Sequence, residues 1–283
     1  MPELDADVDV DADVEHLERL RDELRTLGRV VVAFSGGADS AFLAWVANDT
    51  LGASSCVALT AVSPSLAPEE HDDCAALASE WGLRWEPVVT RELESAMYVA
   101  NGADRCFHCK TALMDVALPV ASREGAVVVL GVNVDDLGDH RPGQAAAASG
   151  GARFPLVDAG FTKADVRAWS QRLGLRTWDK LAAACLASRL PYGTPVTVQL
   201  LQGVAKAESG LRRLGFRDLR VRHYGDTARV ELGVDELPAA LERREDVVAV
   251  VKGAGYRYVT LDLEGFRSGN LNSSLPSRPS LED

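Results

Sequence analysis

The sequence lacks any long uninterrupted run of apolar residues. Although 47% of its 283 residues are hydrophobic, no run approaches the roughly 20 residues that a membrane-spanning helix requires. The N-terminus also lacks the basic and then apolar layout of a secretion signal. With 25% charged residues, the composition is typical of a globular protein. We therefore expect a cytoplasmic protein that does not contact a membrane.

Cysteine is scarce, and positive charge is not in excess. Five cysteines form no small-scaffold disulfide pattern, so in a reducing compartment they indicate chemistry or metal binding. The net charge is −12. Residues 1–23 hold ten acidic and two basic residues, which leaves −4 for the rest of the chain. We expect residues 1–13 to be a disordered acidic arm, and the non-basic body argues against extended nucleic-acid binding.

Short β-branched runs alternate with helical patterns through the first two thirds of the chain. The expected strands are residues 29–34, 56–62, 83–89 and 126–130, and the expected helices include 14–27, 41–49 and 68–81. Further helical stretches flank residues 101–110. This alternation predicts a doubly wound α/β fold, in which a parallel sheet carries helices on both faces.

The pattern changes after Pro191. Helices are expected at 198–214 and 235–252, and strands at 217–223, 227–232 and 256–263. This pattern indicates a smaller α+β domain. The resulting division is an arm at 1–13, a large domain at 14–192, a small substrate or oligomerisation domain at 193–271, and a Ser/Pro-rich disordered tail at 272–283.

The strongest local signal is the segment SGGADS, residues 35–40, between an expected buried strand and a helix. Gly36 and Gly37 permit close backbone approach to a phosphate, and the helix N-terminus supplies amides and a positive dipole end. Ser35 and Ser40 add hydroxyl donors, while Asp39 can hold the Mg²⁺ that accompanies ATP. Neither GxxxxGK[ST] nor GxGxxG occurs in the sequence. An ordinary capped turn is the alternative interpretation.

In this context the SGGADS loop resembles the PP-loop of the N-type ATP pyrophosphatases. That group includes GMP synthetase, NAD synthetase, asparagine synthetase and the tRNA thiolases. The resemblance implies ATP as cosubstrate and cleavage between its α and β phosphates. It further implies adenylylation of a substrate oxygen, release of pyrophosphate, and displacement of AMP by a nitrogen or sulfur nucleophile.

An ordered set of further motifs narrows this resemblance to the LarE family, over roughly residues 14–272. These motifs are GVNVDD (131–136), DHRPG (139–143), FPL (154–156), TKADVR (162–167), WDK (178–180), ACLASR (184–189), PYG (191–193) and LDLEGFRSG (261–269). The segment at residues 149–151 departs from the expected pattern, because a Glu was expected before the glycine.

The LarE resemblance implies a specific activity. Members are ATP-dependent sulfur transferases that build the pincer ligand of the nickel cofactor of lactate racemase. Their substrate is a carboxylated pyridinium mononucleotide, and they are commonly hexameric. Carried over to this chain, the resemblance places Gly131 at the ATP and places Ser188 and Arg189 at the substrate.

Cys185 is the expected sulfur source. A thiolate is the reactive form of cysteine, and Arg189 can favour it if the segment is helical. In the family, such a cysteine attacks the adenylylated carboxylate, its C–S bond then breaks, and the protein keeps dehydroalanine. A buried, inert cysteine is the alternative.

Cys106 and Cys109 form a CxxC pair that leaves a second route open. Such a pair can be redox-active, half a zinc site, or part of an iron–sulfur site. With Cys185 it supplies three ligands for a [4Fe–4S] cluster that carries an exogenous sulfide, as is thought for some LarE-like proteins. We favour the cluster because the sacrificial route gives the pair no role. The alternative is that the pair binds no cofactor.

Residues 206–229 form a basic stretch, with seven Lys/Arg against three Asp/Glu. Arg220 and Arg222 alternate along an expected strand, so they share one face and can grip a substrate phosphate. A solvated strand face is the alternative. Glu208 is a candidate metal or salt-bridge partner.

Two other enzyme classes and one non-catalytic class remain as alternatives. A tRNA thiolase shares the loop and paired cysteines but calls for a basic RNA-binding surface. An amide-forming ligase calls for an ammonia source and leaves Cys185 without a role. A nucleotide-binding regulator would have no need of Asp39 or Cys185, and both are present.

Overall fold

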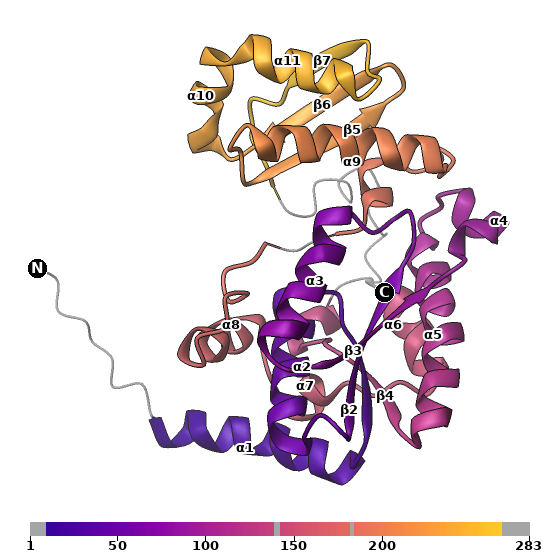
Figure 1. The fold of residues 1–283 in the computed structure, drawn as a ribbon, viewed down its shortest axis with the longest axis vertical. Coiled ribbons are helices and arrows are strands. Elements are labelled where there is room, and N and C mark those ends of the chain that lie inside the picture. The colour runs from indigo at the N-terminus through magenta and orange to yellow at the C-terminus, as the bar shows by residue number, and fades with distance from the viewer. Residues whose placement is uncertain (1–9, 139–141, 182–183, 268–283) are drawn as a thin grey trace, which may run out of the picture. The chain divides into compact units, whose positions relative to one another are not determined.

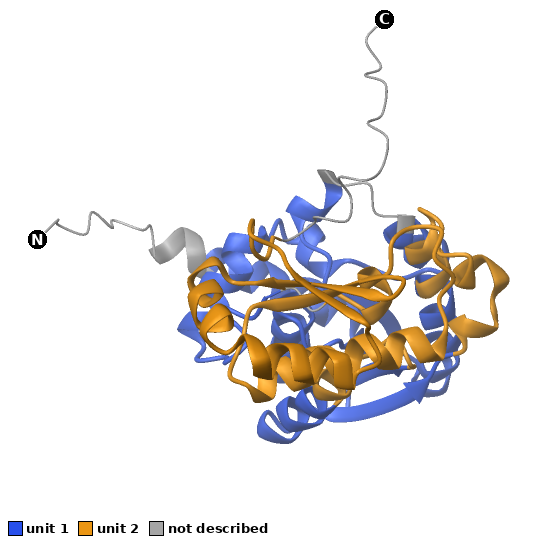
Figure 2. Ribbon diagram, turned by 90° about the horizontal axis from the view of Figure 1, so that it is seen from above, with its two compact units in different colours: residues 1–62, 72–90, 110–181 blue, residues 63–71, 91–109, 182–283 orange. Residues whose placement is uncertain are grey.

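The structure is a computed structural model that describes residues 10–138, 142–181 and 184–267. The chain forms two compact units, coloured separately in Figure 2. The first unit comprises residues 1–62, 72–90 and 110–181, and the second comprises 63–71, 91–109 and 182–283. Within the described ranges, no helix combines the length and apolar character needed to cross a bilayer.

The first unit is built on a four-stranded parallel sheet, as the alternation of strands and helices predicts. Its strands are β1 (Val30–Ala33), β2 (Cys56–Val62), β3 (Arg84–Val89) and β4 (Val127–Leu130), in the order β3-β2-β1-β4. Val31 lies opposite Val57 on one side and Val128 on the other. The chain runs from β1 to β2 and β3 on one side of the sheet and then crosses to β4 on the other side of β1. The carboxyl ends of β1 and β4 therefore mark the switch point of the sheet, where α/β folds bind ligands.

Helices cover both faces of this sheet (Figure 1). They are α1 (Val10–Leu27), α2 (Ala38–Leu51), α3 (Pro68–Glu80), α5 (Arg105–Glu124), α6 (Pro142–Ser149), α7 (Pro155–Asp158) and α8 (Lys163–Arg172). Val30 and Val32 pack with α1, α2 and α8 in one core, whereas Val31 packs with α5 and α6 in the other. Successive strand residues point to opposite faces, so a strand buried on both sides is continuously apolar.

The second unit contains a three-stranded mixed sheet. Its strands are β5 (Leu219–Tyr224), β6 (Thr227–Leu232) and β7 (Tyr258–Leu261), in the order β5-β6-β7. β5 and β6 are antiparallel around Gly225, which has a φ of 60°, whereas β6 and β7 are parallel. The helices of this unit are α4 (Ala96–Val99), α9 (Val198–Arg213), α10 (Leu237–Glu242) and α11 (Arg244–Gly253).

Short 3₁₀ turns complete the described elements: η1 (Glu92–Glu94), η2 (Val134–Gly138), η3 (Leu186–Arg189) and η4 (Val234–Glu236). The helix predicted over 235–252 is divided, because Arg243 leaves the helical region with φ −101° and ψ 26°. The predicted acidic arm also differs in part, since residues 10–13 already belong to α1. The predicted tail at 272–283 lies outside the described residues, as do His140 and Gly269 of the quoted motifs.

The second unit gathers segments that are distant in the sequence. Tyr98 of α4 shares one hydrophobic cluster with Leu186 and Leu190 of the cysteine-bearing segment and with Leu201 of α9. Residues 63–71 and 91–109 therefore belong with the C-terminal part of the chain, whereas the sequence grouped them with the large domain. Periodicity reports local structure and carries no information about which distant segments share a core.

Candidate active site

The SGGADS loop joins β1 to α2 at the switch point of the first sheet. Gly36 has a φ of 70°, a backbone conformation that costs a side-chain-bearing residue energy. A Cβ at Gly36 would lie 2.9 Å from Cys74 Sγ, so the position is also sterically closed. Gly37 is the N-cap of α2 and provides no side-chain cap. The start of α2 thus keeps the features of an anion-binding helix terminus.

Ser35 and Ser40 shape the loop. Ser40 Oγ accepts from the Ser35 amide at 3.2 Å and donates to the Gly37 carbonyl at 3.1 Å. The two hydroxyl oxygens lie 3.0 Å apart. Gly131, just after β4, passes so close to α2 that a Cβ would lie 2.8 Å from the carbonyl carbon of Asp39. These residues hold the loop against its neighbours.

Asp39 is paired with a lysine that the sequence analysis did not single out. Its carboxylate accepts from Lys163 Nζ at 2.5 Å and from Asn133 Nδ2 at 3.2 Å. Lys163 opens α8, after Thr162, whose side chain forms a capping box with Asp165. The TKADVR motif could have pointed to Lys163, since this residue directly follows Thr162, the N-cap of a capping box that is visible in the sequence.

A second lysine reaches the same loop. Lys180 Nζ lies 2.6 Å from Asp73, and a Cβ built on Gly36 would lie 3.7 Å from that ammonium nitrogen. Burial raises the pKa of Asp73, but the hydrogen bonds and positive charges of Lys180 and Arg176 together lower it by more. The net pKa is below its ordinary value, so the carboxyl is held ionised. Lys163 and Lys180 thus place two positive charges around the loop.

The three candidate cysteines lie in the second unit. Cys106 is exposed, whereas Cys109 and Cys185 are half-buried. Electrostatic interactions join Arg105 to Cys185 and Cys106, and join Tyr98 to Cys185 and Cys109. Cys185 therefore shares Arg105 as a neighbour with Cys106, and Tyr98 as a neighbour with Cys109.

No disulfide joins any of the five cysteines, all of which lie in the described residues. Within residues 10–138, 142–181 and 184–267, no three Cys, His, Asp or Glu side chains form a group that can hold a metal ion. Cys56 and Cys74 are fully buried, and burial raises the pKa of Cys56 to about 12. Neither is suited to thiolate chemistry.

Arg189 fixes the backbone beside Cys185. The segment forms the 3₁₀ turn η3, and the guanidinium of Arg189 donates to the carbonyls of Ala184 at 2.6 Å and Cys185 at 3.2 Å. The same guanidinium is paired with the fully buried carboxylate of Glu208 at 2.9 Å. Burial raises the pKa of Glu208, but Arg189, the Val221 amide and Arg212 together lower it by more, so the net pKa is below its ordinary value. The charge of Arg189 is thus already balanced.

Arg220 and Arg222 are buried on one face of β5. Arg222 donates to Glu231 at 3.1 Å and to the Ser188 carbonyl at 2.9 Å. Arg220 lies over the Phe266 ring, with 4.9 Å from Cζ to the ring centre. Burial and repulsion from Arg189 lower the pKa of Arg220 to about 10. The surroundings of Arg220 therefore disfavour its positive charge, and a bound anion would relieve that cost.

Three relatives and one family model resemble this chain. The model described as NAD synthase matches residues 14–111, which include the SGGADS loop. An uncharacterised protein of Synechocystis is 46% identical over 92% of this chain and 97% of its own length. Pyridinium-3,5-bisthiocarboxylic acid mononucleotide synthase of Lactiplantibacillus plantarum is 39% identical over 89% of this chain and 92% of its own length. The chain belongs to the LarE family. An uncharacterised protein of Methanocaldococcus jannaschii is 24% identical over 85% of this chain and 91% of its own length.

The family assignment confirms the predicted class of enzyme, an ATP-dependent sulfur transferase with a PP-loop domain. The roles of individual residues stay predictions. Residues 149–151, which depart from the LarE pattern, lie at the C-terminal end of α6. Gly151 there has a φ of 84°, and Gly150 packs near Met114.

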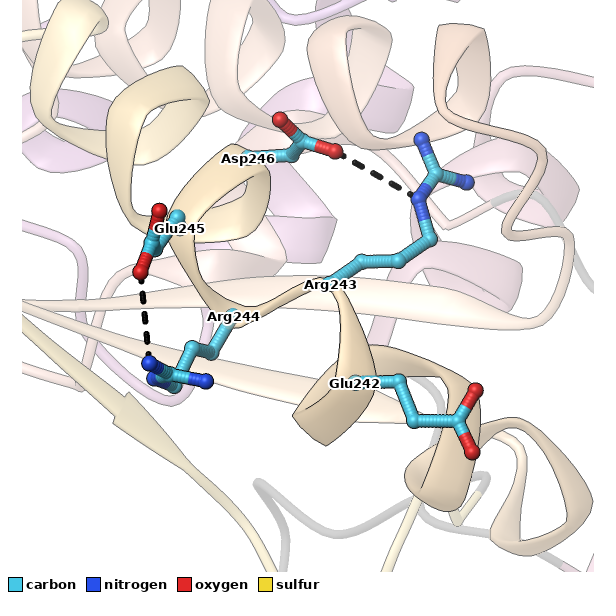
Figure 3. A pocket seen from close by; sticks show the side chains of 5 residues that line it. All are labelled: Glu242, Arg243, Arg244, Glu245 and Asp246. Carbon is cyan, nitrogen blue, oxygen red and sulfur yellow. Dashed lines mark hydrogen bonds and ion pairs between the residues drawn. The ribbon is translucent and has the colours of Figure 1, made fainter.

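A surface hollow lies between α10 and α11 and is unrelated to these residues (Figure 3). Its lining side chains are Glu242, Arg243, Arg244, Glu245 and Asp246. Arg244 pairs with Glu245 at 3.2 Å and Arg243 with Asp246 at 3.5 Å. The hollow contains no thiol, and four of its five charges pair with each other, so it offers no site for the expected reaction.

Proposed function

We propose that this chain uses ATP to replace a carboxylate oxygen of a pyridinium dicarboxylate mononucleotide with sulfur, in the synthesis of a nickel-pincer cofactor. The observation that carries this proposal is the similarity to the bisthiocarboxylic acid mononucleotide synthase over nearly the whole length of both chains. The SGGADS loop supports the ATP-dependent step, and the clustered thiols and arginines of the second unit support sulfur transfer to a phosphorylated substrate.

ATP binds at the SGGADS loop in this proposal. The loop amides and Ser35 contact the phosphates, and the close packing of Gly131 against α2 keeps the loop in place. Lys163 and Lys180 neutralise the β and γ phosphates, and this role extends the residue set predicted from the sequence. Mg²⁺ fits one protein carboxylate plus phosphate oxygens, so Asp39 is a sufficient protein ligand.

The first half-reaction joins the substrate carboxylate to AMP. A carboxylate oxygen attacks the α phosphorus, the bond to the bridging oxygen breaks, and pyrophosphate leaves with the electron pair. Negative charge grows on the leaving pyrophosphate, so cations fixed at the loop stabilise the transition state more than the ground state. The two lysines meet that requirement because Asp39 and Asp73 hold them in place.

The substrate phosphate binds at Arg220 and Arg222. Guanidinium groups match phosphate oxygens geometrically and remain charged at neutral pH. Ser188 lies at the same place, because Arg222 donates to its carbonyl and Arg189 donates to its hydroxyl at 3.0 Å. This arrangement supports roles for Ser188 and Arg189 in positioning the substrate next to Cys185.

Cys185 delivers the sulfur in the sacrificial route. Its thiolate attacks the adenylylated carbonyl, a C–S bond forms, and AMP leaves with the electron pair of the broken C–O bond. A base then removes the Cα proton of Cys185, and the Cβ–S bond breaks with its electrons on sulfur. The product is a thiocarboxylate, and the protein keeps dehydroalanine, having lost the elements of one H₂S.

A [4Fe–4S] cluster on Cys106, Cys109 and Cys185 is the second route, and we favour it because it employs the CxxC pair. The donor set supports this route, since Cys185 shares Arg105 as a neighbour with Cys106 and Tyr98 as a neighbour with Cys109. The thiols must move closer together on binding, because the described residues hold no preformed three-ligand group. When bound, the cluster would supply a sulfide in place of the cysteine sulfur.

One experiment tests the proposed function and separates the routes. Anaerobically reconstituted protein is incubated with ATP, Mg²⁺ and the pyridinium dicarboxylate mononucleotide, and pyrophosphate, thiocarboxylate, iron and intact mass are measured. We expect pyrophosphate release that requires the substrate. Under the cluster route, iron is present, product exceeds one equivalent with added sulfide, and the polypeptide mass is unchanged.

The sacrificial route predicts a loss of one H₂S per turnover and product that stops at one equivalent. Pyrophosphate release without thiocarboxylate, or activity with tRNA or ammonia instead, would overturn the proposal in favour of the thiolase or ligase alternatives. Light scattering of the same sample tests the hexamer expected from the family.

A further inference from the structure

Arg105 is a buried cation whose described partners are uncharged. It opens α5, next to Cys106, and its exposed fraction is 4%. Its Nη1 atom donates to Asn101 Oδ1 at 2.6 Å and to the Ala187 carbonyl at 3.0 Å. Within the described part of the chain, no carboxylate forms an ion pair with it. A buried charge is costly without an opposite charge, so Arg105 calls for an anion.

Two of the candidate cysteines lie beside Arg105. Cys106 is the next residue in the chain, and the Ala187 carbonyl that accepts from Arg105 is two residues beyond Cys185. Cys185, Cys106, Tyr98 and Tyr192 all interact electrostatically with the guanidinium. The ring of Tyr192 lies 5.9 Å from its Cζ atom. Arg189, which the sequence suggested for the thiolate, is occupied by Glu208. Arg105 is therefore the cation next to Cys185 whose charge has no described carboxylate partner.

Asn101 holds Arg105 rigidly against the segment that carries Cys185. Asn101 has a φ of 55°, and no other non-glycine residue in the described ranges has a positive φ. Its side-chain amide donates to the carbonyls of Pro191 at 2.8 Å and Thr194 at 2.9 Å, and the residue is fully buried. A strained residue persists where its surroundings over-determine it, which is common at functional sites.

We infer that Arg105 is the counter-charge for anionic sulfur at Cys185 and Cys106. This inference deepens the proposed function and rests on it for the identity of the reactive sulfur. In the sacrificial route, negative charge is present on the Cys185 sulfur before it attacks the adenylylated carboxylate. It is present again when that sulfur leaves as a thiocarboxylate. A fixed guanidinium stabilises both states, and the neutral hydrogen bonds to Asn101 and Ala187 leave its charge available to do so.

The test compares two alkylating reagents of equal size and different charge. Iron-free full-length protein is treated at one pH with iodoacetate, which is anionic, or iodoacetamide, which is neutral. Peptide mass mapping gives the rate at Cys185. We expect Arg105→Gln to lower the iodoacetate-to-iodoacetamide rate ratio about 3- to 10-fold, the effect of one nearby charge at a partly exposed site.

Two variants serve as controls. Arg91→Gln removes the same charge from an arginine of the second unit whose side chain is 78% exposed, and it leaves the ratio unchanged. Arg105→Lys keeps the charge and retains most of the ratio, which a purely structural role of the guanidinium fork would not allow. Circular dichroism reports whether each variant folds.

A folded Arg105→Gln protein with the wild-type ratio would overturn the inference. If that variant does not fold, the test uses the wild-type protein. The inference then requires the iodoacetate-to-iodoacetamide rate ratio at Cys185 to be higher in the folded protein than in urea. An equal ratio in both states overturns the inference. The assay uses neither ATP nor mononucleotide, so its outcome is independent of whether the proposed reaction occurs.

Discussion

The SGGADS loop and the thiol region differ in how the chain assembles them. The loop consists of six consecutive residues at the end of one strand, so its chemistry is visible in a short stretch of sequence. The thiol region needs residues 98–109, 185–192 and 208–231, which lie together only in the folded second unit. A loop motif can thus be recognised locally, whereas a site built from separate segments is identified by its tertiary contacts.

The two regions also balance charge differently. Around the loop, each lysine faces an aspartate: Lys163 faces Asp39 and Lys180 faces Asp73. Among the described residues of the second unit, four arginines are buried (Arg105, Arg189, Arg220 and Arg222), against the three buried carboxylates of Glu92, Glu208 and Glu231. Excess buried positive charge lowers stability, and bound phosphate and sulfur anions can offset that cost. The predictions below test this contrast.

The largest effect is expected at the loop. Asp39→Asn removes the carboxylate that orients Lys163 and can bind Mg²⁺, so substrate-dependent pyrophosphate release should fall at least about 100-fold. A coupled phosphate assay measures the rate. Asp49→Asn, on the same helix, is the matched control and should release pyrophosphate at the wild-type rate. Release by Asp39→Asn within a factor of two of wild type would reject the assignment of the loop.

Stability is expected to depend strongly on Glu208. Glu208→Gln leaves the buried charge of Arg189 without its carboxylate partner, and the free energy of unfolding should fall by about 3–5 kcal/mol. Urea denaturation measures this quantity. Glu245→Gln, at an 88% exposed side chain, should change it by less than about 0.5 kcal/mol. Equal losses of stability in the two variants would contradict the proposal that Glu208 balances buried positive charge in the second unit.

Arg220 and Arg222 are expected to contribute alike to substrate affinity but differently to stability. A charge-assisted hydrogen bond contributes about 1.5–3 kcal/mol, so Arg220→Ala should weaken mononucleotide binding roughly 10- to 150-fold and leave ATP binding unchanged. Arg222→Ala should weaken binding similarly and also lower stability, because it releases the buried Glu231. Calorimetric titration measures both affinities, with the exposed Arg213→Ala as control. Unchanged mononucleotide affinity in both variants would exclude this phosphate site.

The smallest effect concerns pH. Burial lowers the pKa of His223 below its ordinary value of 6.5, and its ring packs near Tyr256 at 5.8 Å. The unfolded chain therefore binds this proton more readily than the folded protein. The stability that the neutral ring contributes is present above pH 6.5 and is lost as the pH falls toward the folded-state pKa. We expect the free energy of unfolding to be lower at pH 5.5 than at pH 7.5, measured by urea denaturation. His223→Phe should reduce the loss, and an identical loss in that variant would contradict the prediction.

Much of the fold is predictable from the sequence because its signals are local. The strands β2 and β6 match their predicted bounds, and α1 ends at Leu27 as predicted. The division of the last helix at Arg243 was missed, because Pro238 in the first turn of α10 is compatible with one continuous helix. The assignment of residues 63–71 and 91–109 to the second unit depends on packing that periodicity does not report.

The candidate site was predicted only where its residues are adjacent in the sequence. Lys163 lies 124 residues from its partner Asp39, and Lys180 lies 107 residues from Asp73, so neither pair leaves a local pattern. Arg105 was missed although it adjoins the CxxC pair, because its importance follows from burial without a described carboxylate partner. The spacing of Arg189 from Cys185 suggested that its charge could favour the thiolate. That Glu208 pairs with this charge is visible only in the tertiary structure.

The central claim is that a substrate activated at the SGGADS loop receives sulfur at Cys185, either from its own thiol or from a cluster that it binds. Its most direct test compares wild-type and Cys185→Ser proteins with ATP, Mg²⁺ and the mononucleotide, measuring pyrophosphate and thiocarboxylate in one sample. The account predicts that Cys185→Ser still releases pyrophosphate and forms no thiocarboxylate, by either the sacrificial or the cluster route. Thiocarboxylate formation at the wild-type level by Cys185→Ser would contradict both routes.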